Sequence, residues 1–256
     1  MKRFLAVLAC VFSAAAVADD VAASKVLDCM RANIPNVLRV QEFELNAFDR
    51  TGGERMLRGR VYAIRENDLM RAMIKIKAPP DLNNAAYLVR EGKEQDDMFI
   101  FLPALNRVRR IMGGSADSPL FGTDLSYSDV KQVQNSFSGG TVRLEKPDTI
   151  EGHAVHVLAM TPHAGTESHY TLIRGWIDQK ACVPLKIDFY EGANIRKRLS
   201  APAASIKQYN TNWYVSEARM EDLQAKTHTS LKITGFSKPD KLSDRYFNAT
   251  TFYTAE

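Results

Sequence analysis

The sequence lacks the short motifs that mark most catalytic and nucleotide-binding sites. It contains no G-x-S-x-G nucleophile elbow, no glycine-rich phosphate-binding loop, no H-E-x-x-H pair and no C-x-x-C pair. Four of the five histidines crowd between His153 and His169, but alternation along a strand would send His153 and His156 to opposite faces. The sequence therefore predicts no enzyme, no cofactor and no metal site.

Strong charge of one sign and long apolar runs are also missing. The 34 basic and 30 acidic residues nearly balance, whereas nucleic-acid-binding proteins are typically strongly basic. One apolar run stands out, from Phe4 to Ala15, and it is shorter than the roughly twenty residues that a membrane-spanning helix needs. We therefore expect no nucleic-acid partner and no membrane-spanning helix.

The N-terminus is typical of a secretory signal. Two basic residues precede the apolar run, and residues 16–18 (Ala-Val-Ala) match the small-x-small pattern before a cleavage site. We predict cleavage after Ala18, export to the periplasm and a single mature domain over residues 19–256. A lipoprotein signal modified at Cys10 is the weaker alternative, because Cys10 lies in the middle of the apolar run.

Few cysteines remain in the predicted mature chain. Of the three in the sequence, Cys10 lies in the signal, which leaves Cys29 and Cys182. The exported compartment is oxidising, so an even pair of cysteines indicates a disulfide. Such a bond would connect an N-terminal helix to a late strand. Two buried free thiols are the alternative.

What the sequence does have is a long series of period-two patterns. A helix is expected over residues 19–34, ending at Pro35, and nearly everything from there to residue 111 alternates between apolar and polar residues. After Gly139-Gly140 the alternation resumes, with strands expected over 141–146, 153–161, 169–177, 183–191, 195–207, 212–222 and 226–234. These patterns predict a mainly β protein, built on one strongly curved antiparallel sheet with few helices.

One face of this sheet is expected to line an apolar cavity. Apolar residues of consecutive strands share a face, and the strand over 97–102 is apolar on both faces, so both of its sides must be covered. Cover comes from the N-terminal helix, residues 112–139 and a C-terminal segment, which either fill the core or leave a pocket for an acyl chain. The predicted cavity residues are Phe43, Leu45, Val61, Ile74, Ile100 and Leu102.

Residues 112–139 interrupt the strands and predict a lid or plug. They are rich in Gly, Ser and Asp, and long inserts without strands are usually functional or mobile. We predict that Leu120 and Phe121 plug the empty pocket, and that three arginines before the insert meet an anionic head group or an acidic partner at the rim. The alternative is a fixed minor core beside a solvated strand end. The three arginines are Arg107, Arg109 and Arg110.

Two blocks of sequence carry a resemblance to a known family. Residues 98–111 (MFIFLPALNRVRRI) and 120–129 (LFGTDLSYSD) resemble outer-membrane lipoprotein-sorting proteins of the LolA-like superfamily, and more narrowly its branch associated with RND/MMPL-type exporters. Weaker similarity lies at residues 50–55, 77–88 and 182–190. Together these segments run in order through most of the predicted mature chain.

The resemblance implies an unclosed half-barrel with helices as a lid or plug in its concave face. It implies a monomeric periplasmic carrier that binds a lipid, or the acyl part of a lipoprotein, and shuttles it toward the outer membrane. The implied partners are an inner-membrane RND/MMPL-type exporter and an outer-membrane acceptor, with the cargo open between a lipoprotein and a glycolipid or other lipid. A regulatory binding module of the same fold, similar to RseB-type sensors, is the alternative.

Overall fold

The computed structural model describes residues 14–92, 96–134, 137, 139–163, 168–237 and 244–255. Strands account for most of these residues, and the two α-helices are α1 (Ala14–Ala32) and α2 (Tyr127–Gln134). Helix α1 begins before the predicted mature start at Asp19, and it ends shortly before Pro35, as expected. None of the described helices is long and apolar enough to cross a membrane.

The strands fall into a group before residue 112 and a group after residue 139, on either side of the segment predicted to form a lid. The first group is β1 (Arg39–Phe48), β2 (Glu54–Glu66), β3 (Leu69–Ala78), β4 (Ala86–Arg90), β5 (Asp97–Leu102) and β6 (Arg107–Ile111). The second group is β7 (Gly140–Ile150), β8 (His153–Pro162), β9 (Leu172–Asp178), β10 (Pro184–Glu191), β11 (Asn194–Ser200), β14 (Glu217–Asp222) and β15 (Thr227–Ser237).

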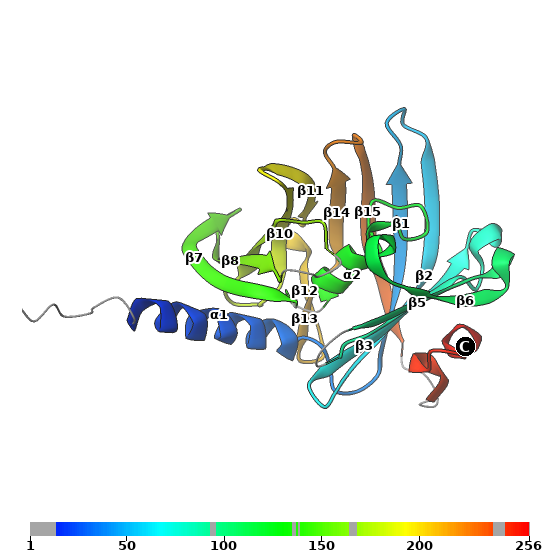
Figure 1. Ribbon diagram of the computed structural model, residues 1–256, viewed down its shortest axis with the longest axis horizontal. Coiled ribbons are helices and arrows are strands. Elements are labelled where there is room, and N and C mark those ends of the chain that lie inside the picture. The colour runs from blue at the N-terminus through cyan, green and yellow to red at the C-terminus, as the bar shows by residue number, and fades with distance from the viewer. Residues whose placement is uncertain are drawn as a thin grey trace, which may run out of the picture.

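All thirteen of these strands form one curved antiparallel sheet (Figure 1). Its order is β6-β5-β4-β3-β2-β1-β15-β14-β11-β10-β9-β8-β7, so the pairing of β1 with β15 joins the two groups at the centre. The two edge strands, β6 and β7, do not pair with each other, and the sheet stays open. The predicted fold class is therefore confirmed.

Two expected strands are wrong as single elements. The strand predicted over 195–207 ends as β11 at Ser200, because Pro202 has no N–H to donate to a neighbouring strand. The chain then forms a separate hairpin of β12 (Ile206–Tyr209) and β13 (Asn212–Val215). This hairpin lies outside the large sheet and lines one end of the cavity described below. The strand predicted over 212–222 is divided at Ser216 into β13 (Asn212–Val215) and β14 (Glu217–Asp222), which belong to different sheets.

The inner face of the sheet carries two apolar clusters. Apolar residues of β1 to β5 pack against the segment between β6 and β7, and those of β8 to β11 pack against α1. Helix α1 contributes Ala23, Val26 and Met30, which recur at helical spacing and are buried. The helix and the segment between β6 and β7 therefore cover much of the inner face of the half-barrel.

The outer face of β3 to β5 is covered by the C-terminal segment. Two short 3-10 helices, η5 (Asp244–Phe247) and η6 (Phe252–Thr254), lie there, and the ring of Tyr253 stacks on that of Phe101 with centroids 3.8 Å apart. The ammonium of Lys75 donates to the carbonyl of Ala255 at 2.5 Å. This cover explains why β5 is apolar on both faces: Phe101 points outward, while Ile100 points inward.

Candidate ligand-binding cavity

An apolar cavity of about 280 Å³ lies on the inner face of the sheet. Its walls come from strands β1, β2, β3, β10, β11, β14 and β15, from the end of α1, from the lid, and from β13 of the small hairpin. A volume of 280 Å³ is close to the lower end, about 300 Å³, of pockets that hold small molecules. The apolar wall and the narrow volume together suit a single acyl chain.

The structure places four of the six predicted cavity residues in this wall: Phe43, Leu45, Val61 and Ile74. Ile100 and Leu102 point to the same inner face, but they pack beside the cavity rather than line it. The lid covers that part of the sheet, where the Tyr127 ring lies 5.1 Å from the ring of Tyr87 on β4.

The lid, defined here as residues 112–134, brings Leu120 and Phe121 into the cavity wall. Both side chains are buried, at 3% and 7% exposure. Phe121 has a φ of 53° and Gly122 a φ of 77°, so two consecutive left-handed residues turn the chain tightly at this point. A left-handed conformation is unfavourable for a residue with a bulky side chain. The packing of Phe121 against the cavity offsets that local cost.

The lid is fastened to the sheet by polar contacts at two points. At the first, the carboxylate of Asp124 accepts hydrogen bonds from the hydroxyls of Thr227 and Thr229 on β15, the latter at 2.6 Å. At the second, the fully buried carboxylate of Asp129 accepts from Lys197 Nζ and from the Tyr170 hydroxyl, each at 2.7 Å. Neither anchor was predicted from the sequence.

Asp129 also holds the start of α2. The Ser126 N–H donates to Asp129 Oδ2 at 2.8 Å, and the Asp129 N–H donates to Ser126 Oγ at 3.1 Å. This reciprocal arrangement is a capping box, with an aspartate in the position usually taken by glutamate or glutamine. The Ser-x-x-Asp spacing was therefore a signal that could have located Asp129. The sequence around Lys197 carries no corresponding signal that Lys197 pairs with Asp129.

A second, polar cavity of about 930 Å³ lies on the other side of the lid. Asp117 of the lid lines it and forms an ion pair with His169, with 2.6 Å between Asp117 Oδ2 and His169 Nδ1. The Asp117 carboxylate raises the pKa of His169 above its ordinary value through this hydrogen bond, and burial opposes the rise. Among the described residues, no three His, Cys, Asp or Glu side chains are grouped so as to hold a metal ion.

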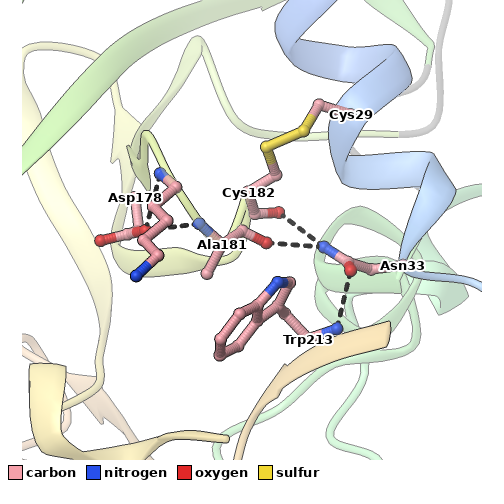
Figure 2. The surroundings of a disulfide bond; sticks show 7 residues. Cys29, Asn33, Asp178, Ala181, Cys182 and Trp213 are labelled. Carbon is pink, nitrogen blue, oxygen red and sulfur yellow. Dashed lines mark hydrogen bonds between the residues drawn. A yellow bond between two sulfur atoms is a disulfide. The ribbon is translucent and has the colours of Figure 1, made fainter. Parts of the chain in front are cut away.

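The far end of the apolar cavity is a junction built around the disulfide (Figure 2). As predicted, Cys29 of α1 forms a disulfide with Cys182; their Cα atoms are 5.8 Å apart. Asn33 then bridges three segments: its amide nitrogen donates to the carbonyl oxygens of Ala181 and Cys182 at 2.8 and 3.3 Å, and its amide oxygen accepts from the Trp213 N–H at 2.8 Å. This end, called the mouth below, is lined by the polar side chains of Asn33, Arg39 and Gln41.

The three predicted rim arginines lie elsewhere. Arg107, Arg109 and Arg110 are exposed on β6, the edge strand of the sheet, and none of them lines the cavity. Arg110 forms an ion pair with Asp97 at 2.6 Å. The structure therefore places these arginines at the sheet edge rather than at the cavity mouth, because β6 is five strands away from β1 in the sheet order.

The comparisons with known proteins agree with this architecture. The model of a protein family described as “Uncharacterized protein” matches residues 68–253. The chain belongs to this family. No match was found among curated proteins.

Solved structures show which fold this family member has. A DUF1329 family protein from Desulfovibrio piger is 22% identical, with a TM-score of 0.80 over 90% of this chain and 97% of its own. A Vibrio parahaemolyticus domain provisionally named as an outer membrane lipoprotein-sorting protein has a TM-score of 0.78 at 22% identity, with the same coverage.

A LolA superfamily protein from Nitrosomonas europaea has a TM-score of 0.68 at 18% identity, over 88% of this chain and 97% of its own. The resemblance to LolA-like proteins is therefore confirmed at the level of the fold. The association with RND/MMPL-type exporters stays a prediction.

Proposed function

We propose that this protein binds the acyl chain of a lipid, or of a lipoprotein, in the apolar cavity and carries it through an aqueous compartment. The observation that carries the proposal is a cavity walled by apolar residues of seven sheet strands and closed by a lid. An acyl chain exposed to water costs roughly 0.8 kcal/mol per methylene, so a carrier must offer apolar cover of this kind. The LolA-like fold of the chain is consistent with this role.

We propose further that the chain is exported to the periplasm, with cleavage after Ala18, and that it moves its cargo toward the outer membrane. The donor is proposed to be an inner-membrane RND/MMPL-type exporter, and the acceptor an outer-membrane component. The exposed arginines of edge strand β6 offer a basic surface for an acidic partner or an anionic membrane. Binding without transfer would instead favour the regulatory module.

Val61→Asp tests the cavity directly. Val61 lines the cavity from β2, and an aspartate carboxylate there would need a polar partner that the apolar wall does not supply. We expect loss of binding of a neutral acyl-chain probe, measured by its fluorescence, in a variant whose circular dichroism matches the parent.

Val108→Asp is the matched control for this experiment. Val108 is also half-buried, but it packs on the outer face of the sheet, away from the cavity. Val108→Asp should therefore leave binding of the probe unchanged. Undiminished binding by folded Val61→Asp would show that acyl chains do not occupy this cavity.

A further inference from the structure

The cavity changes from apolar to polar along one strand. Alternate residues of β1 share a face, and four of them line the cavity in the order Arg39, Gln41, Phe43, Leu45. At about 3.3 Å per residue, the first and last Cα atoms are roughly 20 Å apart. The polar end is the mouth, and the apolar end lies toward the lid. This order of side chains matches an amphiphile with its head at the mouth and its tail inside.

The guanidinium of Arg39 is only partly hydrogen-bonded by the residues that the structure describes. Its Nη1 donates to the Asn33 carbonyl at 3.2 Å, whereas its Nε is buried and has no hydrogen-bond partner. Two other half-buried arginines of the sheet are paired: Arg174 with Glu145 at 2.8 Å, and Arg198 with Asp188 at 2.6 Å. Among the described residues, no carboxylate is paired with Arg39 in this way.

An unpaired guanidinium at an apolar cavity is costly, because a cation removed from water needs a partner to offset its lost hydration. Burial lowers the pKa of Arg39 to about 10, which keeps the side chain charged at neutral pH. A guanidinium presents several N–H groups in one plane, which fits two oxygens of a carboxylate or a phosphate. Gln41 lies two residues further along the same face and can donate from its amide.

We propose that the cavity takes a single-chain amphiphile with an anionic head group, a carboxylate or a phosphate, whose oxygens bind Arg39. This inference rests on the proposed acyl-binding function and names its ligand class. The tail lies between Phe43, Leu45 and the lid, and Gln41 contacts the head. The small volume of 280 Å³ favours one chain over a lipid with several chains.

The test uses the full protein and four twelve-carbon competitors at pH 8. N-phenyl-1-naphthylamine, a neutral fluorescent probe, is displaced by dodecanoate, dodecyl phosphate, dodecanol or dodecylamine. Dodecanoate, dodecyl phosphate or both should bind roughly ten- to one-hundred-fold more tightly than dodecanol, which is the range for a hydrogen bond to a charged group. The stronger of the two anions identifies the head group, and the amine should be the weakest competitor.

Arg39→Gln should remove the preference for anions and leave the affinity for dodecanol unchanged. Arg58→Gln is the matched control, because Arg58 lies on the outer face of β2, paired with Glu44. Equal affinities of the parent protein for dodecanoate, dodecyl phosphate and dodecanol would overturn the inference, whether or not the variant folds. Equal weakening of all ligands by Arg39→Gln would also overturn it. Binding of no acyl compound at all would overturn the proposed function as well.

Discussion

Replacing the lid residues Leu120 and Phe121 by alanine tests whether they act as a plug that cargo displaces or as a fixed part of the cavity wall. In Leu120→Ala combined with Phe121→Ala, two buried side chains of the cavity wall are removed. Substitutions of this kind cost about 2–5 kcal/mol for leucine and about 3–5 kcal/mol for phenylalanine. The residues are adjacent, so the two costs need not add. A loss of at least about 3 kcal/mol is expected for the empty protein.

That loss should be visible as a lower melting temperature. For a chain of this size, each kcal/mol corresponds to roughly 2–4 °C, so the empty variant should melt at least about 6 °C below the parent. The space vacated by the two side chains is continuous with the cavity, because both line it. If they act as a plug, an acyl ligand fills that space, and the affinity for a neutral acyl probe is preserved or raised.

Thermal unfolding by circular dichroism, with and without probe, measures both effects in one series. Leu158→Ala is the control: Leu158 is fully buried in the cluster next to α1 and does not line the cavity, so its truncation should lower stability without changing probe affinity. A folded lid variant that binds the probe far more weakly than the parent would refute the plug. Leu120 and Phe121 would then contact the bound acyl chain as fixed wall residues and would not be displaced by it.

Three further predictions concern the disulfide, the lid ion pair and the sheet edge. Replacing Cys29 and Cys182 by serine should lower the free energy of unfolding by about 2–5 kcal/mol, because the bond closes a loop spanning 153 positions; a urea midpoint equal to the parent's would contradict this. The raised pKa of His169 means that its pairing with Asp117 stabilises the fold below about pH 6.5, and that this contribution disappears as the pH rises through the higher folded pKa. Melting curves of the parent and of His169→Gln should therefore differ most at low pH, and a constant difference would exclude the effect. Arg109→Glu should slow cargo transfer to an acceptor membrane, most strongly at low salt, without changing the melting temperature. Unchanged transfer at low salt would show that the arginines of β6 do not take part in it.

The inner wall of the cavity could be predicted because it depends on a local rule. Residues two apart on a strand share a face, so Phe43 and Leu45 on β1, Val61 on β2 and Ile74 on β3 were assigned to one side. The same rule could not orient β5, whose faces are both apolar. Its outer face is covered by Tyr253, about 150 positions away in the chain, and no local pattern carries that information.

The mouth could not be predicted for the same reason. Its defining contact, from the Trp213 N–H to Asn33 Oδ1, joins residues 180 positions apart. No sequence pattern singles out Arg39, and only the folded structure shows that its Nε is buried without a partner. The Cys29–Cys182 bond is the exception among long-range contacts, because counting cysteines in an oxidising compartment leaves few pairings.

The central claim, that the inner cavity holds an acyl chain, is tested most directly by native mass spectrometry of the protein purified from periplasm without detergent. We expect a population whose excess mass is released on denaturation and identified as an acyl compound, and we expect that population to be absent from Val61→Asp and present in Val108→Asp. Purified protein that carries no acyl compound, and that takes none up when a labelled acyl chain is added, would contradict the account.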